Sequence, residues 1–311
     1  MSAQDYPPVV VLCGGCSSER EVSLVSGRAV YEALAPQLPC EFKILGEEKL
    51  PASLDAAREV IFPVFHGSWG EDGGVQRLLE QGGFAYAGCD AVCSALCMDK
   101  VDTKTRVREH GVPVVKQLTF EGTKKTAAEK IIKTLGEDLV LKPVSDGSSV
   151  GLQMTQGQAA LQAALDKINS GHWMMEPRVR GREFAIGVLY GEPMGIVEIK
   201  PEGGVYDYAH KYTAGSTRYE FPAKLPEQTQ AAMLTAASRS FDVCGCRDFA
   251  RVDFVMDEKG AFYLLEINTI PGLTPTSLMP KSASCAGLDF PALVLKMLQG
   301  AFGRHGTRHD G

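Results

Sequence analysis

Short apolar segments alternate with helical segments over the first part of the chain. Residues 9–12 are entirely apolar and are followed by Gly14 and Gly15, which interrupt the segment. Residues 23–34 carry apolar side chains at helical spacing, and residues 60–65 are again apolar. Strands that are apolar throughout and alternate with helices are typical of a parallel sheet covered on both faces. The sequence therefore predicts an α/β fold at the N-terminus.

The remaining chain is too long for a single core, since the protein has 311 residues. We expect an N-terminal α/β domain over 1–88, a central α+β domain over 89–181 and a C-terminal α+β domain over 182–311. In the central domain the pattern predicts a helix over 99–110 and strands at 112–115, 139–142 and 152–155. In the last domain it predicts antiparallel strand pairs at 183–190 with 194–200 and at 249–256 with 262–267. Helices are expected over 226–243 and 291–298, and the tail from residue 303 is expected to be disordered.

Composition excludes several classes of protein. The net charge is −6 and the sequence pI is near 5.6, so a basic surface for nucleic acid is not expected. No segment approaches the ~18 consecutive apolar residues of a membrane-spanning helix. The N-terminus lacks the basic stretch and apolar run of a signal peptide. With nine cysteines, an odd number, these features predict a cytoplasmic protein without a disulfide framework.

The cysteines form three groups in the sequence: Cys13 with Cys16, Cys244 with Cys246, and Cys89 with Cys93 and Cys97. A zinc site or a redox motif is conceivable for the two close pairs, but structural zinc sites normally have tight ligand spacing on both halves. The third group recurs every four residues, so its members share one face of a helix. The sequence favours buried, apolar roles for them.

Two carboxylates and an amide lie on consecutive predicted strands near the C-terminal end. Arg251 and Asp253 are two residues apart, as are Glu266 and Asn268, so each pair shares one face of its strand. If the strands pair through the turn at 258–260, these side chains converge. Oxygen ligands of this kind suit Mg²⁺, and an arginine can offset charge that develops during a reaction. A solvated strand face is the alternative, but the alternating apolar residues indicate a largely buried pair.

A glycine-rich loop at 146–151 follows Lys142. Its backbone N–H groups at Ser148 and Ser149 can donate to phosphate oxygens, although it lacks the Walker A pattern. An ordinary hairpin turn is one alternative. A serine hydrolase with Ser149 in a G-x-S-x-G elbow is another, but that elbow requires a helix directly after the turn, and a strand is expected here.

Taken together, these segments resemble the D-alanine–D-alanine ligase family of the ATP-grasp superfamily. The resemblance extends from Val9 to about Leu298 and rests on eight segments in order: GGCSSEREVS (14–23), HGSWGEDG (66–73), SALCMDK (94–100), LKPVSDGSSVG (141–151), GREF (181–184), YDYAHKY (206–212), ARVDF (250–254) and LLEINTIPGLTPTSL (264–278).

The resemblance implies a role for each matching position. It assigns ATP to Lys100, Lys142, Ser149, Glu176, Val179, Glu183 and Leu265. It assigns the first substrate to Glu19, which Ser148 and Tyr212 join in closing a lid, with His66 nearby. It assigns the transferred phosphate to Lys211, the oxyanion to Arg251 and Gly272, the second substrate to Ser277 and Leu278, and the metal ions to Asp253, Glu266 and Asn268. The polar stretch 206–219 corresponds to the lid loop.

The implied activity is ligation of two D-alanine molecules through an acyl phosphate, for peptidoglycan precursor synthesis. The implied cofactors are ATP and two Mg²⁺ ions, with Mn²⁺ as a possible substitute. Neither a nucleic acid nor a membrane is implied as a partner, and the family tendency is a homodimer. An ATP-grasp ligase for other small substrates and a catalytically silent nucleotide-binding module are the alternatives.

Overall fold

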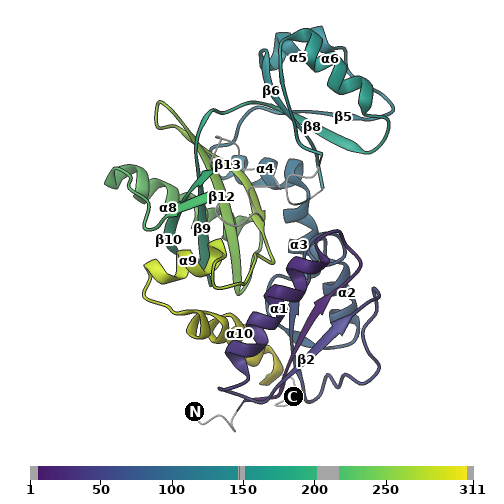
Figure 1. Cartoon of the computed structure of the whole chain (residues 1–311), viewed down its shortest axis with the longest axis vertical. Helices are drawn as coiled ribbons and strands as arrows, with labels where there is room; N and C mark the ends of the chain where they lie inside the picture. The colour runs from purple at the N-terminus through teal and green to yellow at the C-terminus, as the bar shows by residue number, and fades with distance from the viewer. Residues whose placement is uncertain (1–5, 146, 148–150, 202–216, 307–311) are drawn as a thin grey trace.

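The computed structural model describes residues 6–145, 147, 151–201 and 217–306. Within these residues, the strands form three sheets that follow one another along the chain (Figure 1). The first is parallel and the other two are antiparallel. Near the two ends of the described part of the chain, Tyr6 packs on Phe302, with ring centroids 4.8 Å apart.

The N-terminal sheet has the strand order β2-β1-β3-β4 and is parallel throughout. Its strands are β1 (Val9–Gly14), β2 (Cys40–Leu45), β3 (Val60–Val64) and β4 (Ala85–Tyr86). Helix α1 (Arg20–Leu34) covers one face, where Val9 and Val11 pack with Val30. Helix α2 (Gly74–Gln81) covers the other, where Leu12 packs with Leu79. The expectation of a parallel sheet covered on both faces is confirmed.

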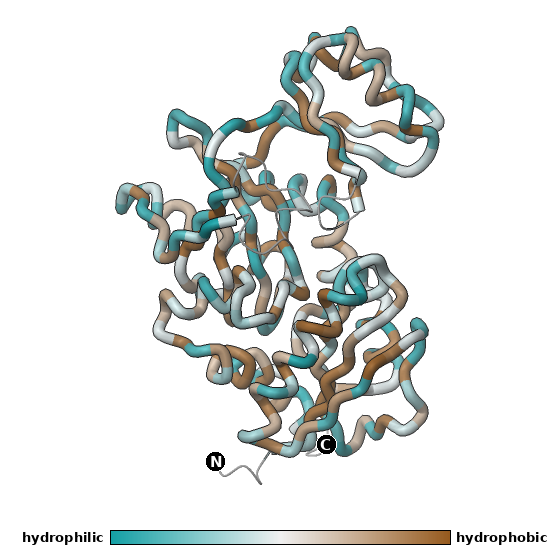
Figure 2. The backbone as a smooth tube through the Cα atoms, in the orientation of Figure 1, coloured by the Kyte–Doolittle hydropathy of each residue, from teal (hydrophilic) through white to brown (hydrophobic). Residues whose placement is uncertain are grey.

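The last helix of the chain also packs on this sheet. Helix α10 (Phe290–Gly306) contributes Leu293, Met297 and Ala301 to the same core as Val9 and Phe62. Figure 1 shows α10 crossing from the C-terminal part of the molecule to lie beside α1. The brown, apolar stretches in Figure 2 likewise run through the strands of this sheet. The first and last parts of the chain therefore share one core.

The second antiparallel sheet has the order β11-β10-β9-β12-β13. Its strands are β9 (Gly181–Leu189), β10 (Glu192–Pro201), β11 (Thr217–Glu220), β12 (Phe249–Asp257) and β13 (Phe262–Asn268). Helix α8 (Glu227–Val243) packs on the face that carries Phe184, Val252 and Phe254. Helix α9 (Leu278–Cys285) packs on the opposite face, where Leu278 contacts Ala185. Alternation along β12 therefore places Arg251 and Asp253 on the face opposite α8.

The remaining sheet has the order β5-β8-β6-β7. Its strands are β5 (Leu118–Glu121), β6 (Asp138–Pro143), β7 (Gln153–Gln156) and β8 (His172–Pro177), and α5 (Ala128–Leu135) and α6 (Gln158–Lys167) share its core. Helices α3 (Ala91–Met98) and α4 (Lys100–Glu109) run between the N-terminal sheet and this upper unit (Figure 1).

Two expectations from the sequence are wrong. Residues 112–115 form no strand, because Pro113 cannot donate a backbone hydrogen bond. Its carbonyl instead accepts from Leu264 N at 2.9 Å, which docks the segment beside β13. The tail does not begin at residue 303, since α10 continues to Gly306. Within the predicted lid loop 206–219, residues 217–219 belong to β11, and 206–216 lie outside the described residues.

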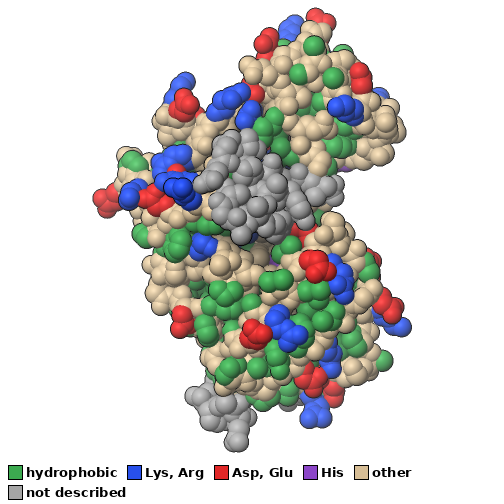
Figure 3. All heavy atoms as spheres, in the orientation of Figure 1, with side chains coloured by type: hydrophobic (Ala, Val, Ile, Leu, Met, Phe, Trp, Pro, Cys, Tyr) green, Lys and Arg blue, Asp and Glu red, His purple; other side chains and the backbone are tan. Residues whose placement is uncertain are grey.

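Among the described residues, no helix combines the length and the apolar character needed to cross a bilayer. On the face seen in Figure 3, Lys and Arg side chains lie among Asp and Glu. This mixing allows short ion pairs at the surface. Lys43 Nζ, for example, lies 2.6 Å from Glu41 Oε2.

Candidate active site

The predicted pairing of β12 and β13 is confirmed and brings four polar side chains together. Asp253 lies opposite Glu266, and Arg251 lies opposite Asn268. The alternating residues Val252 and Phe254 point into the core beneath α8, which leaves the polar members on the other face. Alternation along these two paired strands therefore places two carboxylates, an amide and a guanidinium together on one face of the sheet.

Asp253 is the centre of this cluster. Its two carboxylate oxygens accept from Arg251 Nε at 2.8 Å and Nη2 at 2.7 Å, a bidentate pair. Asn268 Nδ2 donates to Asp253 Oδ2 at 3.1 Å. Glu266 Oε2 lies 3.8 Å from Lys100 Nζ, at the start of α4. Positive groups therefore already surround the carboxylates on the side where a cation would bind.

The donor set of Asp253, Glu266 and Asn268 fits Mg²⁺. Two carboxylates and one amide supply hard oxygen atoms from adjacent strands, and Mg²⁺ uses few protein ligands together with water and phosphate oxygens. The Asn268 side chain can present its amide oxygen by rotating about its last bond. The Arg251 guanidinium now neutralises Asp253, which indicates that this position accepts positive charge.

A cavity of about 290 Å³ opens between the β5–β8 sheet and the β9–β13 sheet. The residues that line it include six of the seven predicted ATP-binding positions: Lys100, Lys142, Glu176, Val179, Glu183 and Leu265. Asp253 and Glu266 line the same cavity. The structure thus brings together groups that the sequence placed up to 166 positions apart, between Lys100 and Glu266. Its mixed apolar and charged lining is typical of a pocket for a small, charged molecule.

Glu176 lies between two lysines at one end of this cavity. Lys142 Nζ is 2.8 Å from Glu176 Oε2, and Lys104 Nζ contacts Glu176 Oε1. Burial opposes ionisation of Glu176, but Lys142 and Lys104 outweigh it and lower the pKa of Glu176 to about 2. Burial and the charge of Lys142 lower the pKa of Lys104 to about 7, against the raising effect of Glu176.

Lys104 was not predicted as a site residue. It lies one turn after Lys100 on α4, and its side chain is fully buried. Fully buried lysines are rare without a partner, so its place beside Glu176 and Lys142 makes it part of the site. The i, i+4 spacing of Lys100 and Lys104 is the only sequence signal that could have indicated a shared face.

A second polar group lies at the C-terminal edge of the N-terminal sheet. Glu19 precedes α1 and is 6% exposed. A Cβ atom added to Gly67 would lie 3.0 Å from Glu19 Oε2, and one added to Gly147 would lie 3.1 Å from it. The Glu19 carboxylate is therefore close to both the 66–73 loop and the glycine-rich loop, as the grouping of Glu19 with Ser148 requires.

His66 connects this edge to the segment that follows β13. Its Nε2 atom lies 3.3 Å from Ser26 Oγ, and Ser26 Oγ in turn accepts from Leu273 N at 3.3 Å. Burial, with a further contribution from Arg251, lowers the pKa of His66 to about 4. His66 is therefore a neutral imidazole at pH 7.

The segment after β13 carries the residues expected to bind the second substrate. Ser277 precedes α9, and its Oγ accepts from Thr274 N at 3.1 Å. A Cβ atom added to Gly272 would lie 3.1 Å from Ser277 Oγ, so these two positions are neighbours. Leu278 is buried against Ala185 on β9.

Four predicted positions, Ser148, Ser149, Lys211 and Tyr212, lie outside the described residues. The segment that follows the glycine-rich loop is strand β7, which pairs antiparallel with β6. A strand–loop–strand hairpin is not the strand–turn–helix of a hydrolase elbow, so this finding argues against the serine hydrolase alternative.

Comparison with known proteins decides the family. A family model described as "D-ala D-ala ligase C-terminus" matches residues 107–299. D-alanine–D-alanine ligase from Syntrophotalea carbinolica is 40% identical over 303 residues, covering 94% of this chain and 95% of the relative. That from Anaeromyxobacter dehalogenans strain 2CP-C is 41% identical over 304 residues, covering 97% and 99%. The chain belongs to the D-alanine–D-alanine ligase family.

Solved structures agree with this membership and confirm the ATP-grasp fold. D-alanine–D-alanine ligase from Bacillus anthracis, solved with ATP, has a TM-score of 0.84 at 26% identity, covering 98% of this chain and all of that one. The VanG D-Ala:D-Ser ligase from Enterococcus faecalis has a TM-score of 0.83 at 28% identity, covering 96% and 100%. Within the family, then, the same fold accompanies more than one second substrate.

Glu71, in the 66–73 segment shared with the family, is a further group that the sequence did not single out. Gly67 N donates to its carboxylate at 2.6 Å. Burial, with added repulsion from Glu19, raises the pKa of Glu71 to about 8. A protonated Glu71 keeps a second negative charge away from Glu19 at pH 7.

Glu71→Gln should flatten the pH dependence of stability between pH 6.5 and 8. The unfolded chain loses the Glu71 proton near pH 4.5 and the folded protein near pH 8, so stability falls as pH rises between these values. The titration of His66 changes stability below pH 6.5, because there the unfolded chain takes up a proton on His66 that the folded protein does not. Because Glu71 is partly exposed, we expect a difference of about 1 kcal/mol across the window. Urea unfolding at both pH values measures it, and equal slopes for the two proteins would contradict the assignment.

Proposed function

We propose that this protein joins two D-alanine molecules into D-alanyl-D-alanine at the expense of ATP, and so supplies a peptidoglycan precursor. The observation that carries the proposal is the cavity between the two antiparallel sheets. It combines buried lysines with the paired carboxylates Asp253 and Glu266. Family membership supplies the substrate.

In this proposal ATP binds in the 290 Å³ cavity. Lys100 and Lys142 contact its phosphates, and Ser149 adds a backbone N–H donor from the glycine-rich loop. Glu176 and Glu183 bind the adenine and the ribose, and Val179 and Leu265 pack beside the base. The proximity of Lys142 to Glu176, 2.8 Å, supports a nucleotide that spans both.

Asp253, Glu266 and Asn268 are the residues that would hold two Mg²⁺ ions, or Mn²⁺ in their place. Bound there, the ions would neutralise charge on the transferring phosphoryl group. Lys211 is proposed to contact the same group. Arg251, now paired with Asp253, is close enough to the centre to stabilise negative charge.

The reaction then proceeds in two steps. The γ-phosphoryl group passes to a carboxylate oxygen of the first D-alanine, which leaves ADP and an acyl phosphate. The amine of the second D-alanine attacks the acyl carbon, and the tetrahedral intermediate expels inorganic phosphate. Phosphorylation is required because a carboxylate is a poor electrophile.

The chain's own residues position these substrates. Glu19 binds the ammonium of the first D-alanine, and Ser148 and Tyr212 join it when the 206–219 loop closes and excludes water. Neutral His66 lies beside that substrate. Ser277 and Leu278 bind the carboxylate of the second D-alanine, and Gly272 N and Arg251 stabilise the oxyanion.

We also propose three domains with boundaries near residues 88 and 181, a homodimer, and a cytoplasmic location. Light scattering of the purified protein tests the dimer, and a monomer mass at micromolar concentration would refute it.

The proposal predicts phosphate release from ATP only when D-alanine is present, with D-alanyl-D-alanine as the product by mass. D-serine tests the second site, because the VanG ligase of similar fold is a D-Ala:D-Ser ligase. In an equimolar mixture we expect the D-alanine dipeptide to predominate, since the relatives at about 40% identity are D-alanine–D-alanine ligases. Phosphate release without D-alanine would refute the function, and a predominant D-Ala-D-Ser product would refute the second-substrate assignment.

A further inference from the structure

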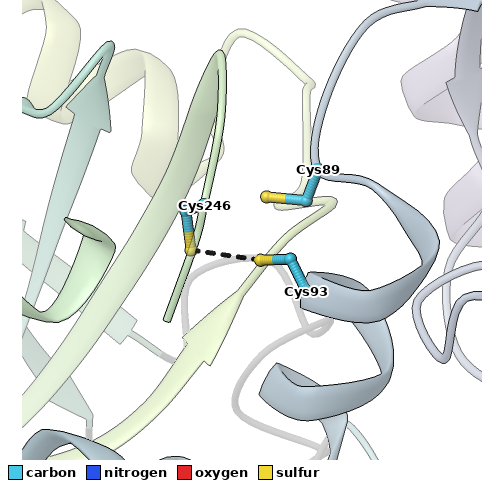
Figure 4. A group of neighbouring side chains, drawn as sticks. All are labelled: Cys89, Cys93 and Cys246. Carbon is cyan, nitrogen blue, oxygen red and sulfur yellow. Dashed lines mark hydrogen bonds between the residues drawn. The ribbon is translucent and has the colours of Figure 1, made fainter. Parts of the chain in front are cut away.

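Five cysteines from two distant parts of the chain meet in the core beside α3. They are Cys89, Cys93, Cys97, Cys244 and Cys246. Figure 4 shows that Cys89 approaches from the segment entering α3 and Cys93 from the first turn of α3, while Cys246 approaches from the connection between α8 and β12. The ligase reaction proposed above uses none of them.

Three of the thiols have the spacing of a metal–thiolate centre, and the fourth lies beside two of them. Cys93 Sγ lies 3.5 Å from Cys246 Sγ and 3.9 Å from Cys97 Sγ, and Cys97 Sγ lies 4.0 Å from Cys246 Sγ. The Sγ atoms of Cys89, Cys93 and Cys246 all lie within 4.8 Å of one another. Four sulfurs arranged tetrahedrally at about 2.3 Å from a zinc ion are about 3.8 Å apart. The triangle of Cys93, Cys97 and Cys246 already matches one face of that tetrahedron.

The surroundings of the thiols offer a positive charge and few strong competing contacts. Cys93 occupies the first turn of α3, and Arg247 follows Cys246 directly, so a positive charge lies near the thiols. Cys89 Sγ has only long contacts, of 3.7 Å and 3.8 Å, to the carbonyls of Arg247 and Phe249. Replacing these two weak contacts by a bond to a metal ion would cost little free energy.

We propose that Cys89, Cys93, Cys97 and Cys246 form a zinc site. Zinc takes four thiolates without a geometric preference of its own, and binding releases the thiol protons to solvent. The resulting centre has a net charge of −2, which Arg247 partly offsets. The ion would join Cys93 to Cys246, 153 residues apart, and would fix the start of α4 three residues beyond Cys97. Cys244 remains a buried thiol beside Cys97.

The site is tested by metal content rather than by activity. Protein purified under anaerobic, reducing conditions with zinc in the medium should contain one zinc ion per chain by mass spectrometry. Cys93→Ser should weaken zinc binding by at least about 100-fold, because even outer-shell partners of zinc contribute 10–100-fold. Cys285→Ser is the matched control, since that cysteine lies outside the cluster, and it should keep the full metal content.

A second measurement needs no variant. Co²⁺ added to metal-free protein should give an intense sulfur-to-cobalt absorption that zinc abolishes, and zinc should protect four of the nine cysteines from a thiol reagent. Wild-type protein that is folded and reduced but binds no zinc would overturn the proposal, as would binding of Cu(I) alone. An air-formed Cys93–Cys246 disulfide in protein that takes up no metal when reduced would instead assign the cluster to thiol oxidation.

Discussion

Glu266→Gln should slow D-alanine-dependent phosphate release by a factor on the order of 10²–10³, the usual loss when one electrostatic stabiliser of a transition state is removed. Glu266 lies opposite Asp253 on the paired strands, and its carboxylate is 3.8 Å from Lys100. The amide keeps the shape of the side chain but removes the charge that a bound cation would require. Steady-state phosphate release with saturating ATP and D-alanine measures the loss.

Glu258→Gln is the control for this variant. Glu258 is exposed in the turn that joins the same two strands, so its loss should leave the rate unchanged. The thermal midpoint of Glu266→Gln should stay near that of the wild type, because the Glu266 side chain keeps 25% of its surface exposed. A rate within twofold of the wild type would show that Glu266 is not required, and would remove the basis for a metal site here.

Glu176→Gln should destabilise the protein by about 3–5 kcal/mol at pH 7, the usual cost of breaking a buried ion pair from one side. The change leaves the buried Lys104 side chain and the ammonium of Lys142 without the carboxylate that both contact. Urea unfolding measures the loss. Glu129→Gln, on an exposed position of α5 in the same unit, should change stability little.

Two further measurements separate charge from packing. Burial already lowers the pKa of Lys104 to about 7 with Glu176 present, and removing the carboxylate lowers it further. The variant should therefore regain stability as pH rises from 7 toward 10, because Lys104 is then neutral in the fold while the unfolded chain loses its proton only near 10.5. Lys104→Met combined with Glu176→Gln should lose less than Glu176→Gln alone. If neither recovery occurs, the loss arises from packing and not from the lysines.

The features that the sequence predicted well depend on local periodicity. Alternation along residues 249–256 and 262–267 determines which side chains share a face, so the meeting of Asp253 with Glu266 followed once the strands were assumed to pair. The parallel N-terminal sheet followed in the same way from apolar strands separated by helices. Val112 and Val115 look equally like a strand, but Pro113 removes a donor and the segment docks through its carbonyl instead.

The features that the sequence did not predict depend on distant partners. Lys104 lies on a helix rich in charged residues and resembles a solvated lysine until Glu176, 72 residues later, is placed beside it. The cysteines at 89, 93 and 97 were correctly expected to be buried, but Cys89 precedes α3 and does not share a helix face with the other two. Their spacing carries no information about Cys246. Glu71 was not predicted for the same reason, because the pKa of Glu71 depends on Glu19, which lies in another loop.

The packing of α10 on the N-terminal sheet has a consequence for the order in which the protein can fold. As the chain is synthesised, residues 9–87 emerge early, but Leu293, Met297 and Ala301, which complete their core, emerge last. Until then α1 and earlier segments such as the one carrying Phe249 cover this face of the sheet incompletely. The part of the molecule made first therefore waits for nearly the whole chain before its apolar surface is shielded from solvent.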